Sequence, residues 1–270
     1  MMKYSNGKGK IISNREVAPD HYKMEVEAPT TFGEALPGQF VMVKVSDGVV
    51  PILRRPFGIF QTNKDRGSFE ILYRKVGEGT RLLADIAPGV NLDILGPLGT
   101  GFDLDLSGDN PILIAGGVGI APLYMLAKEL VSAGKQVKVL FGSRGKNDLL
   151  VVDELKTLGI ELLIATEDGS EGFKGYGTGL LEELLERGEE ISSVYACGPE
   201  PMLEKVDKIA ISHNLICQLS LEAIMACGFG VCLGCVVKTC TKDKDREFDY
   251  NRVCCEGPVF NAGEVIWDEA

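Results

Sequence analysis

Histidine is scarce in this 270-residue sequence, which contains only His21 and His213. We therefore expect no histidine-based mechanism, and nothing calls for a Ser-His-Asp or paired-carboxylate site, so we name no catalytic residue. No apolar run approaches the roughly 18 residues that a membrane span needs. Residues 1–14 carry scattered lysines but no apolar signal core. These absences predict a protein of the cytoplasm, without a membrane partner.

Positive charge is also in short supply, with 28 Lys and Arg against 39 Asp and Glu and a net charge of -11. No local basic patch offsets this total, so we expect no nucleic-acid partner. A disulfide framework is disfavoured as well, because thiols stay reduced in the cytoplasm. The eight cysteines need another explanation.

Three of these cysteines, Cys227, Cys232 and Cys235, follow a C-x4-C-x2-C spacing interleaved with glycines. Thiolates suit iron, and plant-type 2Fe-2S proteins use this spacing with one more, distant cysteine. A structural zinc site also takes four cysteines, although it usually pairs them as two C-x2-C units. The loop is thus predicted to bind a 2Fe-2S cluster, with zinc or redox-active thiols as alternatives.

From residue 11 to about residue 106, short runs alternate apolar and polar residues, with Pro and Gly turns between them. This pattern predicts a small antiparallel barrel. Inside it lie Arg-Pro-Phe-Gly at 55–58 and a segment from Tyr73 to a helix start at Gly79 and Thr80. Arginines and a helix start favour phosphate binding, and two such elements predict a pyrophosphate ligand. Alternatively, Arg55 and Arg74 merely pair with surface carboxylates.

The pattern changes at residue 111, where continuous apolar strands alternate with amphipathic helices up to residue 214. This alternation predicts a doubly wound parallel sheet with its ligand site at the carboxyl ends of the strands. The first strand is followed by Gly116, Gly117 and Gly119, which lead into a helix and favour pyrophosphate binding. Cys197 ends a later strand and is either a ligand-loop residue or a buried core thiol.

The remaining tail is too short and too rich in cysteine for an independent core. Residues 238–252 form a polar, charged insertion, which we expect to be a solvated hairpin or loop. After it, Cys254 and Cys255 offer a fourth ligand, and Cys240 is a further candidate. The predicted division is residues 1–106 for the barrel, 107–214 for the nucleotide domain and 215–270 for the cluster module.

In combination, Arg-Pro-Phe-Gly at 55–58, the glycine loop at 116–122 and Cys-Gly-Pro at 197–199 resemble the ferredoxin-NADP reductase superfamily. The cysteine loop and Cys-x2-Gly-Pro-Val-Phe at 254–260 narrow the resemblance. Over essentially all 270 residues the chain is similar to the electron-transfer subunits of heteromeric, NAD-linked dihydroorotate dehydrogenases. This resemblance implies an FAD-binding barrel, an NAD-binding domain and a 2Fe-2S module.

The resemblance also implies a role for individual residues. FAD would be held by Arg55, Pro56, Phe57, Gly58, Leu72, Tyr73, Arg74, Gly79 and Thr80, although the family's usual serine is replaced by Gly58 here. The nicotinamide nucleotide would be held by Gly116, Gly117, Gly119, Cys197 and Gly198. The cluster ligands would be Cys227, Cys232, Cys235 and Cys254, the last chosen over Cys255 by its match to Cys-x2-Gly-Pro.

The implied partner is a catalytic subunit that carries FMN, with two copies of each chain, in pyrimidine biosynthesis. Alternatives are the small subunit of an NADH-dependent ferredoxin:NADP oxidoreductase or of a sulfhydrogenase, and a non-catalytic, zinc-stabilised flavin-binding module. Arg144 and Lys146 are suited to bind the 2'-phosphate of NADP, whereas the family resemblance favours NAD.

Overall fold

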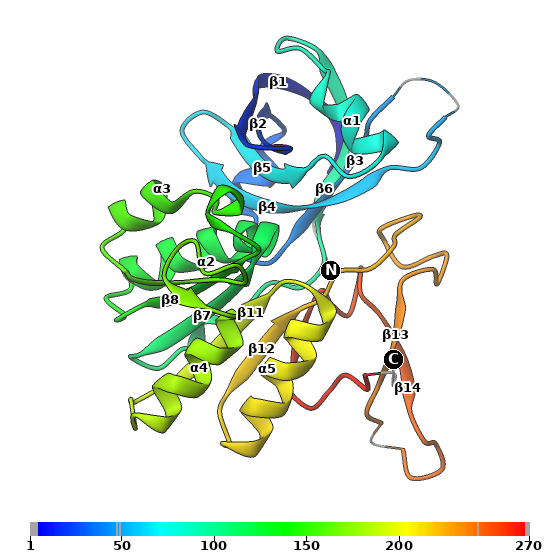
Figure 1. Ribbon diagram of the computed structural model, residues 1–270. Coiled ribbons are helices and arrows are strands. Elements are labelled where there is room, and N and C mark those ends of the chain that lie inside the picture. Colours follow the sequence, from blue (N-terminus) through cyan, green and yellow to red (C-terminus); the bar gives the residue numbers. More distant parts are fainter. Residues whose placement is uncertain (1–4, 47, 49, 242, 268–270) are drawn as a thin grey trace.

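The computed structural model describes residues 5–46, 48, 50–241 and 243–267. Its N-terminal part is a closed barrel in the order β1-β2-β5-β4-β3-β6, and every neighbouring pair is antiparallel (Figure 1). The predicted antiparallel barrel is confirmed. Its strands are β1 (Ser5–Ala18), β2 (His21–Glu27), β3 (Phe40–Lys44), β4 (Arg55–Asn63), β5 (Ser68–Arg74) and β6 (Asn91–Leu98).

The barrel closes over its own apolar core because alternate strand residues point inward. Met24, Val26, Ile59 and Ile71 are fully buried there. Between β5 and β6 the short helix α1 (Glu78–Ala84) adds the buried Leu83 to this core. The 3-10 turns η1 (Thr30–Glu34) and η2 (Leu104–Leu106) complete the region.

The α/β part of the chain is built on a seven-stranded sheet in the order β10-β9-β8-β7-β11-β12-β15. All of its pairs are parallel except β12 with β15. The strand order reverses between β7 and β11, which makes this the switch point of a doubly wound sheet. The strands are β7 (Pro111–Gly116), β8 (Lys138–Ser143), β9 (Glu161–Thr166), β10 (Phe173–Lys174), β11 (Ser193–Cys197), β12 (Cys217–Ser220) and β15 (Val259–Asn261).

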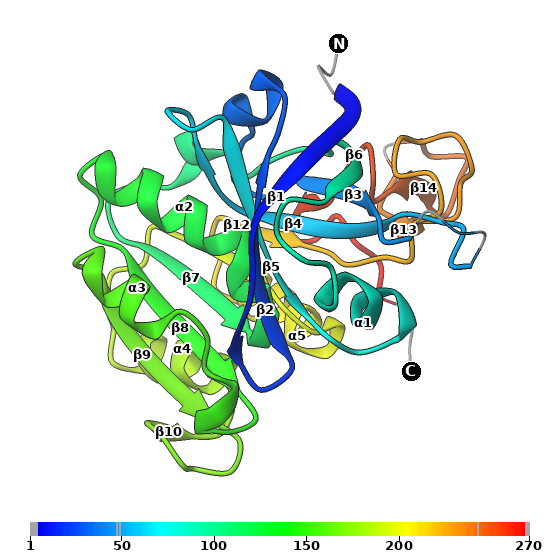
Figure 2. The same ribbon diagram turned by 90° about the horizontal axis from the view of Figure 1, so that it is seen from above.

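Helices cover both faces of this sheet (Figures 1 and 2). Ile112 and Ile114 of β7 share one core with α4 and α5, whereas the intervening Leu113 and Ala115 share the other with α2 and α3. A central strand buried on both sides explains the continuous apolar run in the sequence. The helices are α2 (Ile120–Ser132), α3 (Val152–Thr157), α4 (Gly177–Glu186) and α5 (Glu200–Ser212), with 3-10 turns η3 (Gly117–Gly119) and η4 (Lys146–Asp148).

The C-terminal segment both extends the sheet and forms a separate module. β12 and β15 lie beyond residue 214, so the sheet continues past the boundary that we predicted. Residues 238–252 lie within the hairpin of β13 (Val236–Thr239) and β14 (Asp249–Arg252), as expected. Met42 and Phe40 of the barrel share a core with Cys235 and Cys254, which binds the module firmly to the barrel.

Several contacts hold the barrel against the α/β domain, among them a ring stack, an ion pair and the hydrogen bond from Lys128 to Gln61 at 3.1 Å. Phe60 of β4 stacks on Tyr124 of α2 at 4.3 Å between ring centroids. Beside this stack, the Lys23 ammonium lies 2.5 Å from the Glu154 carboxylate of α3. Among the described residues, no helix combines the length and apolar character needed to cross a bilayer.

Candidate flavin, nucleotide and cluster sites

The structure brings the two expected phosphate-binding elements of the barrel together. A Cβ at Gly79, in the first turn of α1, would lie 3.1 Å from the Nε of Arg55. The Arg55 guanidinium otherwise donates only to backbone carbonyls, among them that of Leu53 at 2.8 Å. Among the described residues Arg55 pairs with no carboxylate, so the surface ion-pair alternative has no support for this arginine.

Thr80 differs in part from its expected role. Its hydroxyl accepts hydrogen bonds from the N–H groups of Val76 and Gly77, at 2.9 and 3.1 Å, and donates to the Gly77 carbonyl. The hydroxyl that we expected to meet an anion is therefore engaged by the helix start itself. Its effect is to hold the 76–77 backbone in place before α1.

Aromatic rings line the same side of the barrel. Phe57 of β4 makes an edge contact with Tyr73 of β5, and Tyr73 stacks on Tyr22. The Tyr73 hydroxyl donates to Asn14, and burial raises its pKa well above its usual value. Leu72 is buried on the α/β side, and Pro56 pairs with Met42 of β3. Phe57 and Tyr73 are buried in the barrel core, so their rings stabilise the strands that carry the expected flavin-binding residues.

Lack of space does not explain why Gly58 stands where the family usually has a serine. A Cβ at this position would lie 3.6 Å from Pro122 of α2, which is ordinary contact. The position faces the helix that follows the glycine loop. It therefore sits where the barrel and the α/β domain meet.

The glycine loop after β7 lies tightly against the end of β11. A Cβ at Gly119 would stand 2.2 Å from the carbonyl oxygen of Cys197, so no side chain fits there. Gly117 adopts a φ of 54°, in the left-handed region. The loop turns directly into α2, which leaves its backbone N–H groups at a helix start.

A cavity of ≈ 730 Å³ joins the two domains. The barrel contributes His21 and Arg74, which face each other across β2 and β5. The α/β domain contributes loops at the carboxyl ends of its strands, where a doubly wound fold binds its ligands. These loop residues include Gly116, Gly117, Val118, Gly142, Ser143, Arg144, Gly198, Met202 and Glu222.

Cys197 itself is not on the wall of this cavity. Its side chain is buried, and burial, followed by the nearby Glu222, raises the pKa of the thiol to about 12. It therefore stays a neutral thiol at neutral pH. This agrees with the alternative that Cys197 is a buried core thiol. Its neighbour Gly198 is the residue of this pair that faces the cavity.

Glu222 was missed by the sequence reasoning, as was the ligand-facing position of His21. Glu222 follows β12, and burial raises the pKa of its carboxyl group. Had residues 217–220 been recognised as another parallel strand, the rule that ligands bind at strand ends would have placed Glu222 at the site. His21 carried no such signal, because its position depends on the pairing of β2 with β5.

In the cysteine loop, backbone N–H groups point toward the sulfur of Cys227. Burial acts to raise the pKa of the Cys227 thiol, but backbone hydrogen bonds outweigh it and lower the pKa to about 6. The donors are the N–H groups of Cys232, Phe229 and Val231. Gly228 and Gly230 make this inward turn possible with φ values of 80° and 86°.

The four expected ligands come from the cysteine loop and from the segment after β14. Cys235 and Cys254 share one buried cluster, and the Val253 N–H donates to the Cys235 carbonyl at 2.9 Å, whereas Cys232 helps to lower the pKa of Cys227 within the loop. Cys255 also touches Cys254, at 3.8 Å between sulfurs. Within the ranges that the structure describes, no three Cys, His, Asp or Glu side chains converge as they would around a single metal ion. Thiols together with inward N–H groups are what an iron-sulfur cluster needs.

Barrel, switch-point cavity and cysteine loop define a flavin- and nicotinamide-dependent oxidoreductase of the ferredoxin-NADP reductase type with an added iron-sulfur module. Three family models match in the same order. They describe an oxidoreductase FAD-binding domain at residues 8–102, an oxidoreductase NAD-binding domain at 113–208 and the iron-sulfur cluster binding domain of dihydroorotate dehydrogenase B at 222–266.

Curated relatives extend this likeness to the whole chain. The dihydroorotate dehydrogenase B (NAD(+)) electron transfer subunit of Desulforamulus reducens is 37% identical over 96% of this chain and 97% of its own length. That of Caldanaerobacter subterraneus is 39% identical over 96% and 98%. A solved structure of an NADH-dependent reduced ferredoxin-NADP oxidoreductase matches with a TM-score of 0.85 at 31% identity, over 96% of this chain and 90% of the other. The chain belongs to the family of dihydroorotate dehydrogenase B electron transfer subunits.

Proposed function

We propose that this chain passes electrons from a separate catalytic subunit, which oxidises dihydroorotate, through an iron-sulfur cluster and FAD to NAD in pyrimidine biosynthesis. The observation that carries the proposal is the cavity that joins the Arg74 side of the barrel to Gly116 and Gly198 of the α/β domain. A flavin on the barrel and a nicotinamide on the switch point would meet there.

In this proposal the barrel holds FAD through Arg55, Pro56, Phe57, Gly58, Leu72, Tyr73, Arg74, Gly79 and Thr80. The α/β domain holds NAD through Gly116, Gly117, Gly119 and Gly198, while the buried Cys197 packs in the core directly before Gly198. When bound, the cluster would carry single electrons and FAD would collect two of them for hydride transfer to NAD. The chain itself binds, orients and excludes water, and no side chain is required as an acid or base.

Cys227, Cys232, Cys235 and Cys254 are the proposed cluster ligands. Support comes from the iron-sulfur family model that matches residues 222–266 and from the shared buried cluster that places Cys235 beside Cys254. The loop also rests on the barrel, since a Cβ at Gly228 would lie 2.5 Å from Met42 of β3. The cluster would thus lie against the flavin-binding domain, which suits electron transfer between them.

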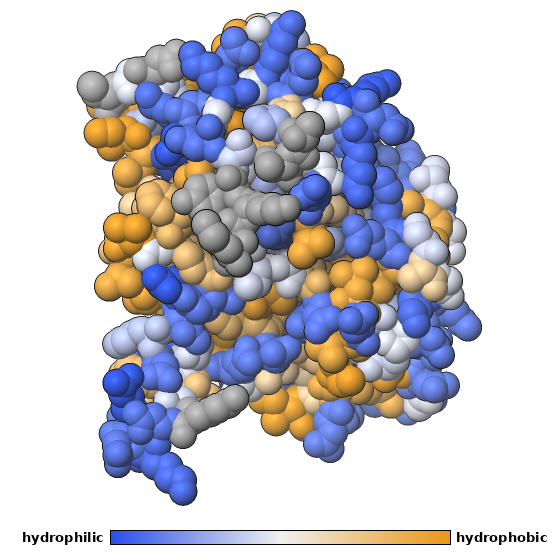
Figure 3. Space-filling model, turned by 180° about the vertical axis from the view of Figure 1, so that it is seen from behind, coloured by the Kyte–Doolittle hydropathy of each residue, from blue (hydrophilic) through white to orange (hydrophobic). Residues whose placement is uncertain are grey.

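We also propose the docking surface for the catalytic subunit. The side chains around the cysteine loop are unusually exposed for apolar residues, with 91% of Ile224, 72% of Val231 and 61% of Leu233 accessible. The loop between β3 and β4 lies on the same side in Figures 1 and 2 and adds Val50 and Ile52, exposed by 67% and 72%. Hydrophobic residues gather along this edge, on the left in Figure 3.

An apolar edge beside the cluster fits a permanent protein partner. We propose that this partner is the catalytic subunit, that it carries FMN, and that the complex holds two copies of each chain. We place the complex in the cytoplasm, where the eight cysteines stay reduced. NAD rather than NADP is the proposed acceptor, because Lys146 already lies 3.8 Å from the Glu171 carboxylate.

The test is reconstitution under anaerobic conditions. The chain alone should show flavin and iron-sulfur absorption and should oxidise NADH with an artificial acceptor, but should not oxidise dihydroorotate. Adding the catalytic subunit should couple dihydroorotate oxidation to NAD reduction, with mass measurement of the complex giving its stoichiometry. Dihydroorotate oxidation by the chain alone, or flavin bands accompanied by zinc, would contradict the proposal.

A further inference from the structure

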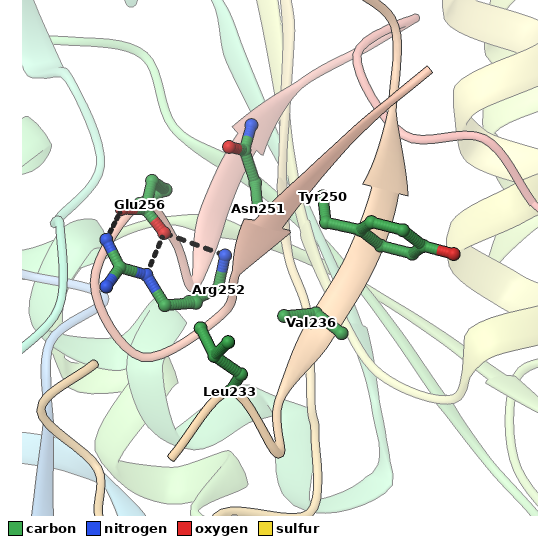
Figure 4. Close-up of a pocket in the computed structure, with 6 residues that line it drawn as sticks. All are labelled: Leu233, Val236, Tyr250, Asn251, Arg252 and Glu256. Atoms are coloured by element: carbon green, nitrogen blue, oxygen red, sulfur yellow. Dashed lines mark hydrogen bonds and ion pairs between the residues drawn. The ribbon is translucent and has the colours of Figure 1, made fainter. Parts of the chain in front are cut away.

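Arg252, the last residue of β14, is held on two sides. Its Nη1 donates to the carbonyl oxygen of Gly230 at 2.7 Å. Its Nε donates to Oε2 of Glu256 at 2.9 Å, and its Nη2 donates to Oε1 of the same carboxylate (Figure 4). The Arg252 backbone N–H also donates to Oε2, at 2.7 Å. The position of the guanidinium is therefore fixed by both partners.

This arrangement places a charge against the cysteine loop. Gly230 lies between Cys227 and Cys232, and a Cβ there would stand 3.0 Å from Nη1 of Arg252 and 2.5 Å from the Cys255 sulfur. Arg252 also stands two residues before Cys254, and the N–H of Cys255 donates to the Arg252 carbonyl at 3.1 Å. A permanent cation therefore borders the loop that supplies the proposed ligands.

Glu256 counters this cation. Its carboxylate accepts hydrogen bonds from the side chain and the backbone N–H of Arg252, which places a negative charge directly against the guanidinium. The pair lies at the rim of a hollow of ≈ 550 Å³ that is lined by Leu233, Val236 and Tyr250 (Figure 4). About a third of each charged side chain is exposed, at 34% and 35%, so solvent screens the pair only in part.

A cluster ligated by thiolates is anionic and gains another negative charge on reduction. Its potential depends on the charges, hydrogen bonds and solvent around it. We propose that Arg252 and Glu256 set the reduction potential of the cluster, with Arg252 favouring the reduced form and Glu256 offsetting it. Arg252 is a positioning residue, because it also ties down the Gly230 carbonyl. The inference rests on the proposed function, since it presupposes the cluster.

The experiment measures cluster potentials by optical and EPR-monitored redox titration of the full chain, prepared anaerobically. Arg252→Gln should shift the potential negative, with a roughly threefold to tenfold fall in the ratio of reduced to oxidised cluster at a fixed potential. Tenfold corresponds to about 59 mV for a one-electron couple. Glu256→Gln should shift it positive, and the double variant should lie between the two.

Arg246→Gln is the matched control, since Arg246 pairs with Asp243 and Asp249 in the same hairpin, whereas it is Arg252 that donates to the Gly230 carbonyl. Its potential should stay near that of the parent. Shifts of the same sign in both single variants, no shift in either, or an equal shift in the control would overturn the inference.

If Arg252→Gln fails to hold the cluster, Glu256→Gln alone decides the inference, because a positive shift supports it and an unchanged potential overturns it. A parent chain without iron-sulfur absorption or an EPR signal after reduction would instead overturn the proposed function. An intact parent signal with unmoved potentials defeats only the role of Arg252 and Glu256.

Discussion

In the glycine loop after β7, the space around a single backbone position determines which residue type can stand there. At Gly119 the clash of any Cβ is with a backbone carbonyl, at 2.2 Å, and a backbone atom cannot rotate away. The glycine run was visible in the sequence, but which of its members tolerates no side chain depends on how closely β7 and β11 are paired. The sequence identified the glycine loop, but only the fold shows why Gly119 cannot carry a side chain.

Gly119→Ala is therefore expected to destabilise the α/β domain by about 3 kcal/mol, the upper part of the range for overpacking. Urea unfolding followed by circular dichroism, together with NADH binding, measures the effect. Gly7→Ala is the control, because a Cβ there meets nothing closer than 3.9 Å. Equal stability of the two variants would show that β11 can move away.

The two adjacent cysteines should behave differently. Cys254 is buried and contacts Cys235, whereas Cys255 is half-buried and lies against Gly230. Cys254→Ser should lose most of the iron and the iron-sulfur absorption, and Cys255→Ser should keep both. Iron analysis and visible spectra of the two purified chains make the comparison. The reverse pattern would make Cys255 the fourth ligand.

At the scale of elements, the sequence predicted the barrel, the parallel sheet and its principal helices, because each has a clear apolar period. It did not predict that β12 and β15 belong to the sheet. These strands have four and three residues, and their assignment rests on pairing with β11 and with each other rather than on any local pattern. Glu222 was missed for the same reason, since its place follows from β12.

The joint between barrel and α/β domain is also an element-scale feature. Lys23 of β2 is 9% exposed and lies 2.5 Å from Glu154 of α3 and 3.9 Å from Glu70. The Oε2 atom of Glu70 is buried and has no hydrogen-bond partner among the described residues. Lys23 is thus the charge that compensates Glu70, and it links the two domains.

Lys23→Met should weaken this joint by about 1–2 kcal/mol, below the usual cost of breaking a fully buried pair because Glu154 is partly exposed. Differential scanning calorimetry should show a lower melting temperature, and limited proteolysis should cut faster between the domains. Lys208→Met removes an exposed helical pair with Glu204 and serves as the control. Unchanged melting of Lys23→Met would mean that the other contacts of the joint, among them the Phe60–Tyr124 stack and the Lys128–Gln61 hydrogen bond, suffice to hold it.

For the whole molecule, the proposed path of electrons enters through the apolar edge beside the cysteine loop, crosses all three parts and ends at NAD in the cavity between the barrel and the α/β domain. Ile224 and Val231 have side chains that water largely surrounds, at 91% and 72% exposure, so a charge there should cost the isolated chain little. In a complex the same charge would be buried against an apolar partner and would be strongly unfavourable.

Val231→Lys is accordingly expected to keep FAD, iron content and NADH oxidation with an artificial acceptor, while raising the dissociation constant for the catalytic subunit at least tenfold. Sedimentation of the mixed subunits and coupled dihydroorotate oxidation report the loss. Ile211→Lys, on α5 of the α/β domain and 55% exposed, introduces the same charge away from the cysteine loop and should bind normally. Normal assembly of Val231→Lys would move the docking surface elsewhere. Loss of assembly in both variants would instead trace the effect to net charge, because the chain already carries -11 and each lysine changes it equally.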